Sequence, residues 1–484
     1  MAAKPVAPLI FTFDIGTSSL RTTLVDGSGL RIEGTTAQES YRLREGADGC
    51  AELAPAVLKR AAKSCMARTL AVRRDGRGLS RVPITAVAAS CFWHSLIGTD
   101  EKNRPLTPVY TWADSRCRGD AAALRTELGE RAIHARTGCM VRASYWPAKL
   151  AWLYRVDRGL FSSVRRWMSP AEWLYGEFAG EAQCGLSMAS GTGLLNAHTL
   201  AWDEGLLERF RISPAQLNAL TEAPVEPSRA GRAFPELAGA RWYPALGDGA
   251  ASNLGSGATR PGLAAINVGT SAALRVMRGG PVRPFPFGLF CYRVDAARHL
   301  VGGAVSNAGN LRAWCLRQLR LDESEIEPGL EGRPLPEHGL TVMPFWSAER
   351  APLWEEERRG SIEGFTFSTI ALDILQALTE ASYYRIGMIA DLVVKQERAV
   401  PRFIVSGGIQ HSASSLRRLA NVLNQPIYPN PEPEASIRGA ALYALEREGV
   451  TVAPLRLGRP VRPQAAAAAA YARERARQAA AESQ

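Results

Sequence analysis

The sequence lacks any long apolar run. In 484 residues no stretch approaches the roughly eighteen uninterrupted apolar residues that a membrane-spanning helix needs. The first eight residues, Met1 to Pro8, are too short and too weakly patterned for a signal peptide. We therefore expect a cytoplasmic protein with no membrane partner.

Cysteine is scarce and scattered. The eight cysteines contain no C-x-x-C pair and no spacing typical of metal ligands. We expect reduced, mostly buried thiols and no metal–thiolate site.

A nucleic-acid signature is also lacking, although 58 lysines and arginines against 47 acidic residues give a net charge of +11. The basic residues are spread along the chain, and no block of aromatic and basic residues stands out. We expect no nucleic-acid partner. The positive charge either raises the local concentration of anionic substrates such as nucleotides and sugar acids, or has no functional meaning and reflects a composition in which arginine replaces lysine.

The composition is that of a globular chain long enough for two cores, with 46% hydrophobic and 22% charged residues. Strand patterns that alternate with helical patterns predict an α/β fold. The alanine-rich tail predicts either a helix or a frayed end. The patterns predict strands at 82–90, 106–112 and 402–406, and helices at 120–136, 149–154, 170–178, 368–394 and 412–423.

A glycine turn between two apolar strands is the first candidate site. In "FDIGTSSLRTTLVD", Gly16, Thr17 and Ser18 provide backbone N–H groups and hydroxyls with little bulk, as a polyphosphate requires. The neighbouring carboxylate of Asp14 would repel phosphate unless a cation lay between them, which suggests Mg²⁺. The alternative is an ordinary glycine hairpin with surface hydroxyls.

The same pattern returns about 250 residues later. In "LAAINVGTSAALRVM", an apolar strand is followed by Gly269 and Thr270 and then by another apolar strand. This separation suits two tandem domains of ordinary size and suggests a duplication. The second copy favours the phosphate interpretation, with two hairpins facing one another across a cleft.

An aspartate between two glycines precedes the second hairpin. In "PALGDGAASNLGSGA", Asp248 lies at the start of a small-residue helix, where it can reach a substrate hydroxyl. A carboxylate at that place can take the proton of a hydroxyl that accepts a phosphoryl group, so Asp248 is our candidate general base. The alternative is an aspartate that caps the helix.

Aromatic and polar residues follow two predicted strands of the first half. Trp93, His94, Trp112, Asp114 and Arg116 could stack on a polyol and bond its hydroxyls. The alternatives are a core histidine bonded to backbone at position 94, and edge-of-core and capping roles at positions 112 and 114.

A strand, a Gly407-Gly408 turn and a helix lie near the end of the chain. Glycines there let the backbone lie against a flat ligand, and the helix N-terminus favours anions. Together with the two hairpins, this turn suggests a nucleoside site.

The order of these motifs resembles that of the FGGY carbohydrate kinases, which share a superfamily with actin and heat-shock chaperone ATPases. The resemblance covers nearly the whole chain and includes "TWAD" from Thr111, "GDGA" from Gly247, "PFWSAERAPLW" from Pro344 and "EASIRGAALYAL" from Glu434. It implies an α/β chain of two ribonuclease-H-like, actin-like ATPase domains with a cleft between them. The expected parts are an N-terminal domain at 1–240, a C-terminal domain at 241–463 and the alanine-rich tail at 464–484.

Within the family, "TWAD", "GDGAASNLGSGA" and "LVGGAVSNAGNLRAW" resemble the gluconate kinase branch. The resemblance implies transfer of the γ-phosphate of ATP to the terminal hydroxyl of D-gluconate, with ATP and Mg²⁺ as cofactors. It makes Asp248 the base and a metal ligand together with Asp14. It assigns phosphates to Gly16, Thr17, Ser18, Gly269 and Thr270, substrate to His94, Trp112, Asp114 and Asp248, and adenosine to Gly407 and Gly408.

Two places depart from the family pattern. Arg417 and Asn421 stand where the family usually has glutamine and aspartate, and Phe92-Trp93 replaces a pair that usually contains methionine. The second change affects the sugar site, so a kinase of another polyol or ketose, such as xylulose, glycerol or erythritol, is the alternative. A non-catalytic actin-like ATP-binding protein is a third possibility, and a homodimer is left open.

Overall fold

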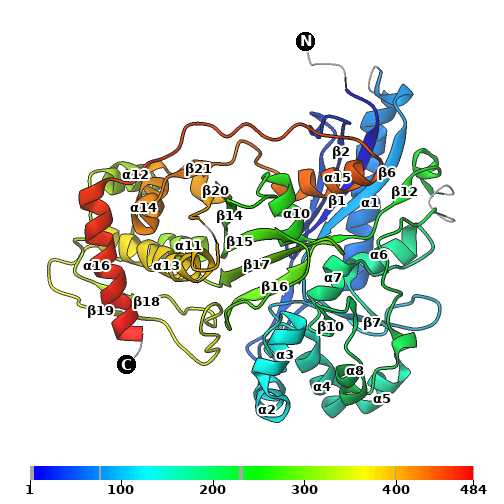
Figure 1. The fold of residues 1–484 in the computed structure, drawn as a ribbon, viewed down its shortest axis with the longest axis horizontal. Helices are drawn as coiled ribbons and strands as arrows, with labels where there is room; N and C mark the ends of the chain where they lie inside the picture. Colours follow the sequence, from blue (N-terminus) through cyan, green and yellow to red (C-terminus); the bar gives the residue numbers. More distant parts are fainter. Residues whose placement is uncertain (1–4, 76–77, 228–232, 398, 483–484) are drawn as a thin grey trace.

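Two six-stranded sheets form the centre of the molecule. The computed structural model describes residues 5–75, 78–227, 233–397 and 399–482. Figure 1 shows one sheet among the N-terminal elements and the other among the C-terminal elements. Within the described residues, no helix combines the length and the apolarity needed to cross a membrane.

The first sheet is built on β1 (Leu9–Ile15), in which every residue except the partly exposed Asp14 is buried. It pairs antiparallel with β2 (Ser19–Val25) and parallel with β6 (Ile84–Cys91). The path of the sheet is β12-β6-β1-β2-β3, with β13 also paired to β6. The three outer strands are β3 (Ala37–Ser40), β12 (Arg241–Trp242) and β13 (Leu246–Gly247).

The second sheet repeats this arrangement. Strand β14 (Leu263–Val268) pairs antiparallel with β15 (Ala272–Gly279) and parallel with β20 (Arg402–Ser406). The path is β16-β17-β15-β14-β20-β21, so each sheet has a central strand with a hairpin partner on one side and a parallel strand on the other. The shared topology confirms the expected duplication. The outer strands are β16 (Phe290–Arg293), β17 (Arg298–Val305) and β21 (Ile427–Pro429).

Two helices cross closely between the sheets, as Figure 1 shows. They are α10 (Asp248–Gly255) and α15 (Ala435–Arg447), and α15 also packs on β1 and β6. A Cβ atom on Gly255 would lie 1.7 Å from the carbonyl oxygen of Ala435, and one on Gly439 would lie 1.7 Å from that of Ala251. The two glycines therefore fix the crossing, and with it the place at which α10 begins.

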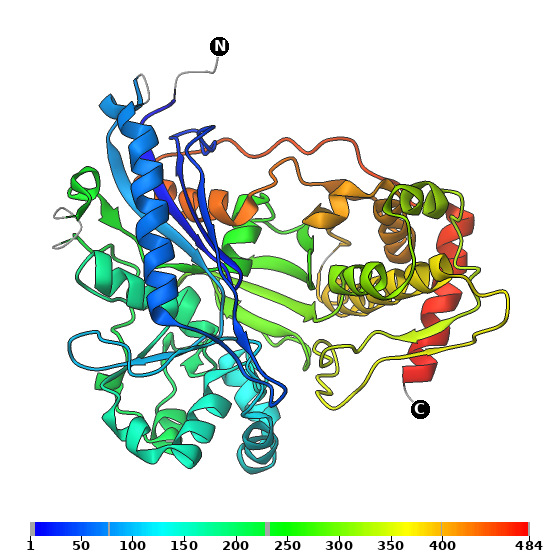
Figure 2. The same ribbon diagram turned by 180° about the vertical axis from the view of Figure 1, so that it is seen from behind.

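The remaining helices cover the sheets and build the lower lobe of the first half in Figure 1. Helix α1 (Pro55–Asp75) packs on β2 and β3, and Figure 2 shows it along the outer side of that sheet. Helix α13 (Ala371–Val394) packs on β15 and β17. The others are α2 (Arg118–Leu128), α3 (Glu130–Thr137), α4 (Trp146–Val156), α5 (Arg158–Ser163), α6 (Pro170–Phe178), α7 (Leu186–Ser190), α8 (Glu204–Phe210), α11 (Gly309–Gln318), α12 (Glu323–Glu331) and α14 (Ala413–Leu423).

Short strands outside the two large sheets complete the fold. They form one three-stranded and three two-stranded sheets. These strands are β4 (Arg44–Glu45), β5 (Ala51–Leu53), β7 (Ile97–Thr99), β8 (Val109–Tyr110), β9 (Arg166–Met168), β10 (Leu195–Asn196), β11 (Ala201–Trp202), β18 (Thr341–Met343) and β19 (Ser361–Glu363).

The tail forms a packed helix, α16 (Ala465–Glu482), and is not a frayed end. It lies against α13, α14 and β18, and both figures show the preceding segment running across the molecule to reach that place. Tyr471 is fully buried, and its hydroxyl donates to the Glu380 carboxylate over 2.7 Å. Packing of this tyrosine adds to the helix propensity of alanine.

Most predicted elements lie where the sequence placed them. The helix at 170–178 and the strand at 402–406 are found with the predicted bounds. The predicted helix at 120–136 is wrong as a single element, because Gly129 separates α2 from α3 with a φ of 66°. The predicted strand at 106–112 is reduced to β8. All eight cysteines are free and buried, as expected.

The predicted division at residue 240 stays a prediction. The two short strands that follow it, β12 and β13, pair with β6 and thus extend the first sheet. The second sheet begins only with β14, after α10.

Candidate active site

Asp248 is the first residue of α10. Its side chain is exposed to solvent, and the protein packed around it raises the pKa of its carboxyl group. Gly247 occupies the N-cap position of α10, so the alternative in which Asp248 caps the helix is wrong.

The glycines on either side of Asp248 make room for Trp93. A Cβ atom on Gly247 would lie 1.8 Å from Cε2 of the indole, and one on Gly249 would lie 2.6 Å from Cζ3. The indole N–H donates to the Ser187 carbonyl over 2.9 Å, and the Gly247 N–H donates to the Ser187 hydroxyl over 3.0 Å. Trp93 and Ser187 thereby fix the backbone that presents Asp248.

Asp14 brings the first hairpin into electrostatic range of Asp248. Its negative charge acts on Asp248 and favours the protonated form of that carboxyl group. Arg21 on β2 donates to Asp14 over 2.5 Å and to Glu434 over 2.6 Å, which links the hairpin to the start of α15. The two aspartates that the sequence singled out therefore lie in one electrostatic environment.

Both predicted phosphate turns are confirmed as hairpins. The N–H of Gly16 donates to the Ser19 carbonyl, and that of Gly269 donates to the Ser271 carbonyl, each over 2.9 Å. The side chains of Thr17, Ser18 and Thr270 are at least partly exposed, and no described residue bonds their hydroxyls. These hydroxyls are free to contact a ligand.

The Gly407-Gly408 turn lies against the second hairpin. Gly407 has a φ of 92°, a conformation that favours glycine, and a Cβ atom there would lie 2.5 Å from the carbonyl oxygen of Val268. The Gly407-Gly408 turn is thus in contact with β14, the strand that leads into the Gly269-Thr270 hairpin.

His94 has an ordered ring in an aromatic cluster. Its ring centroid lies 4.7 Å from that of Tyr145 and 5.5 Å from that of Tyr292. Burial lowers its pKa to about 3, so the ring is neutral near pH 7. Nδ1 lies 2.5 Å from the Gly191 carbonyl oxygen, which can only accept, so Nδ1 carries the proton and Nε2 is left as an acceptor.

Trp112 and Asp114 differ in their surroundings. Trp112 is half-buried, and the Arg350 guanidinium lies 5.5 Å from its ring centroid. Asp114 is buried and accepts from the Arg116 side chain over 2.5 Å and from the Ala51 N–H over 3.1 Å. Its oxygens therefore hold the loop that carries Trp112, and direct contact of Asp114 with substrate stays a prediction.

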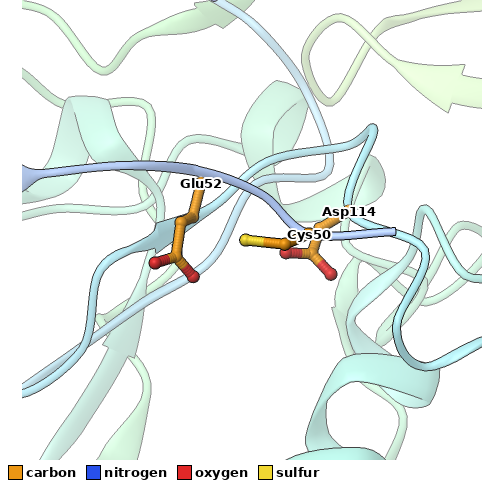
Figure 3. A group of neighbouring side chains, drawn as sticks. All are labelled: Cys50, Glu52 and Asp114. Carbon is orange, nitrogen blue, oxygen red and sulfur yellow. The ribbon is translucent and has the colours of Figure 1, made fainter. Parts of the chain in front are cut away.

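A Cys50–Glu52–Asp114 cluster is the group of potential metal ligands that the described residues contain, as drawn in Figure 3. Arg116 already bridges it, because Nη2 lies 2.7 Å from Glu52 and 2.5 Å from Asp114. Burial also raises the pKa of the Cys50 thiol and so disfavours the thiolate that a metal would need. The Arg116 guanidinium therefore supplies the positive charge that a metal ion would supply at this cluster.

Two residues near Asp248 escaped the sequence analysis. Arg275 on β15 and Arg350 both act electrostatically on its carboxylate. The chain has 58 lysines and arginines, so composition alone does not distinguish these two. The signal that could have identified them is their place in the chain: Arg275 ends "GTSAALR" at the second hairpin, and Arg350 lies within "SAERAPLW".

The departures at 417 and 421 connect α14 to its neighbours. Arg417 forms an ion pair with Glu331 of α12 at 2.9 Å. The Asn421 side-chain oxygen accepts from the Gln464 N–H over 2.8 Å, at the entry to α16. Both side chains line a cavity of about 390 Å³. Arg417 thus connects α14 to α12, and Asn421 connects α14 to the entry of the tail helix.

Known proteins share this fold along nearly its full length. The gluconokinase of Bacillus subtilis (strain 168) is 26% identical over 456 residues, which cover 90% of this chain and 87% of that protein. The structure of a gluconate kinase from Lactobacillus acidophilus superposes with a TM-score of 0.89 at 24% identity, over 98% of both chains. A xylulose kinase from the same organism superposes with a TM-score of 0.90 at 24% identity, over 99% of this chain and 98% of that one.

Two family models match the chain in succession. Residues 9–239 match the N-terminal domain, and residues 264–446 the C-terminal domain, of the FGGY family of carbohydrate kinases. The fold is the expected two-domain actin-like ATPase fold. With most of its length matched in the family's own domain order, the chain belongs to the FGGY family of carbohydrate kinases.

Proposed function

We propose that the protein transfers the γ-phosphate of ATP to the terminal hydroxyl of a sugar acid, with D-gluconate as the substrate and Asp248 as the general base. The observation that carries this proposal is the setting of Asp248: open to solvent, surrounded by protein, and within the field of Asp14 and of two arginines. The gluconokinase of Bacillus subtilis supports the choice of acceptor.

Asp248 acts on the acceptor hydroxyl in this proposal. The raised pKa makes its carboxylate a better proton acceptor than an ordinary aspartate, while the Arg275 charge keeps it ionised. Its Oδ1 accepts from the Gly249 N–H over 2.8 Å, which orients the carboxylate. The proton of the hydroxyl passes to Asp248 as the bond to phosphorus forms.

The hairpins bind the phosphates. The free hydroxyls of Thr17 and Thr270 and the turn N–H groups suit phosphate oxygens. Gly407 and Gly408 contact the nucleoside. On the acceptor side, Trp112 stacks on the carbon face of the sugar, and Nε2 of His94 accepts from a hydroxyl.

Mg²⁺ fits the residues present. Mg²⁺ is usually held through one or two carboxylates together with substrate phosphates, and Asp14 and Asp248 supply two carboxylates whose charges repel one another. The ion would supply charge neutralisation for the phosphates. Asp14 and Asp248 would hold it, and Arg21, which donates to Asp14, would orient that carboxylate.

A kinase for a neutral polyol or ketose is the second candidate. The likeness to a xylulose kinase structure and the Phe92-Trp93 departure beside His94 favour it. A non-catalytic ATP-binding protein is disfavoured, because Asp14 and Asp248 are both present.

Release of ADP by the purified protein tests the proposal. The assay compares D-gluconate with D-xylulose, glycerol, erythritol and no acceptor, each with Mg²⁺-ATP. We expect turnover with D-gluconate well above all other acceptors. Turnover with a neutral acceptor alone would move the protein to the second candidate, and equal ADP release with and without every acceptor would contradict kinase activity.

A further inference from the structure

Arg275 and Arg350 are cations without acceptors in the described part of the chain. Nε and Nη1 of Arg275 and Nε of Arg350 are buried and have no hydrogen-bond partner. Neither guanidinium takes part in an ion pair among the described residues. Burying such donors unpaired costs free energy, so a site that keeps them invites a ligand that completes them.

The fully buried arginines behave differently. Each donates to a carboxylate or to backbone carbonyl groups: Arg385 to Glu349, Arg418 to Glu380, and Arg293 to the Ala197 carbonyl. Arg142 and Arg438 likewise donate to backbone carbonyls. The fold therefore gives each buried arginine an acceptor, whereas the partly buried Arg275 and Arg350 have none. Arg73, Arg118 and Arg447 also have an unpaired Nε, but their side chains make a hydrogen bond or an ion pair.

The two guanidinium groups flank the place where an acceptor would lie. Arg275 lies beside the start of α10, because a Cβ atom on Gly249 would lie 2.7 Å from its Nε. Arg350 lies over the Trp112 ring, on the side of the aromatic cluster. Burial lowers the pKa of Arg275 most, and the Arg350 charge lowers it further against the opposing Asp248 carboxylate. Asp248 also acts on the pKa of Arg350, so both guanidinium groups lie in the field of that carboxylate.

We propose that Arg275 and Arg350 together bind the carboxylate of the acidic acceptor and so determine that the enzyme prefers sugar acids to neutral sugars. This inference rests on the proposed function. The guanidinium fork matches a carboxylate in geometry, and the unpaired N–H groups supply the donors. Asp248 and the two arginines would then contact the reacting hydroxyl and the carboxylate of the same polyhydroxy acid.

The same guanidinium chemistry also suits the transferred phosphoryl group. The placement favours the carboxylate, because phosphate already has the hydroxyls and N–H groups of the two hairpins, whereas Arg350 lies on Trp112 among the aromatic side chains. The test below separates these two sources of negative charge.

Binding without nucleotide is the decisive measurement. Calorimetric titration of the full chain with D-gluconate and with D-glucitol compares two molecules that differ only in carboxylate against hydroxymethyl. We expect the wild-type protein to prefer D-gluconate. Arg275→Met and Arg350→Met should each raise the Kd for D-gluconate about 30-fold or more, because each leaves the carboxylate short of a charged donor. The Kd for ATP should stay unchanged.

Arg278→Met is the matched control. Arg278 lies on the same strand as Arg275 but is ion-paired with Glu397 at 2.7 Å, so its loss should leave the Kd for D-gluconate unchanged. Arg275→Lys keeps the charge and loses the fork, and should give an intermediate Kd. Circular dichroism confirms that each variant is folded, and Arg350→Met tests the inference independently if Arg275→Met fails to fold.

Two results would overturn the inference. If Arg275→Met and Arg350→Met bind D-gluconate as the wild type does while kcat falls, the guanidinium groups serve the phosphoryl group. If the wild-type protein binds D-glucitol as tightly as D-gluconate, no carboxylate site exists. In either case, turnover of D-gluconate by the wild-type protein would still support the proposed function. Failure of the proposed function would be seen separately, as the absence of that turnover.

Discussion

Gly247 lies so close to Trp93 that a methyl group at position 247 would approach Cε2 of the indole to 1.8 Å. Gly247, which precedes the candidate base, and Trp93, which precedes His94, are thus closely packed. The tryptophan at position 93 therefore depends on the absence of a side chain at position 247.

Gly247→Ala should therefore abolish most acceptor-dependent ADP release and lower the free energy of unfolding by about 1–3 kcal/mol, because overpacking displaces the indole or α10. Urea unfolding and the ADP assay measure the two effects. Adding Trp93→Met should restore part of both, since methionine is flexible.

Gly239→Ala is the control for this substitution. A Cβ atom at position 239 would have no neighbour within 4 Å, so stability and activity should be unchanged. If Gly247→Ala behaved like Gly239→Ala, the close fit between Trp93 and Gly247 would have no consequence.

The pH dependence follows from the carboxyl group of Asp248. Burial raises its pKa above the ordinary 3.8, and the Arg275 charge opposes the rise. A base works only when deprotonated, so kcat should fall as the pH drops through this raised pKa. Removing the charge with Arg275→Met should raise the pKa further and move the acid limb to higher pH.

Profiles of kcat against pH for the wild type and Arg275→Met measure this shift. His94, with its pKa lowered to about 3, should add no step near its ordinary 6.5. An acid limb that stayed at the same pH in Arg275→Met would contradict the electrostatic pairing of Arg275 with Asp248.

His94 should matter for binding of the acceptor. His94→Ala removes the Nε2 acceptor and the ring contact with Tyr145, and we expect KM for the acceptor to rise about 3- to 10-fold, the effect of one hydrogen bond. His94 has a φ of 67°, which asparagine tolerates well, so His94→Asn is the matched variant that keeps the backbone relaxed. A KM unchanged in both variants would show that the ring only fills the core.

The tail helix should stabilise the half of the molecule that carries Arg350. Glu482 of α16 pairs with Arg385, which also pairs with Glu349, the neighbour of Arg350 in sequence, and all three side chains are buried. Glu482→Ala should lower the free energy of unfolding by about 3 kcal/mol, because it leaves a buried charge short of a partner.

Glu474→Ala on the same helix is the comparison. Glu474 forms a partly exposed pair with Arg477, so its loss should cost only about 0.5 kcal/mol or less. Equal unfolding midpoints in urea for the two variants would contradict a structural role for the Arg385 pairs.

The features that could be predicted from the sequence are those that depend on local patterns of residues. The two glycine hairpins, the strand at 402–406 and the helix at 170–178 are set by turn residues and by apolar periodicity, and each lies where predicted. The repeated hairpin also led to the duplication seen in the two sheets. Asp248 could be singled out because two glycines flank it at the start of a small-residue helix, shortly before the second hairpin.

The remaining features depend on contacts between distant segments. Tyr471 and Glu380 are 91 residues apart, so no local pattern could show that the tail packs. Arg275 and Arg350 differ from the buried arginines in having guanidinium N–H groups without an acceptor, which depends on the folded surroundings of each side chain. The burial of Asp114 against Arg116 likewise requires the strand that carries Ala51.

Acceptor-dependent ADP release by wild-type protein and Asp248→Asn, measured side by side with D-gluconate and Mg²⁺-ATP, tests the central claim most directly. Asparagine keeps the size of the side chain but cannot take a proton. The account predicts that kcat falls by about 100-fold or more while the Kd for ATP is unchanged. Turnover in Asp248→Asn equal to that of the wild type would contradict the assignment of Asp248 as the base.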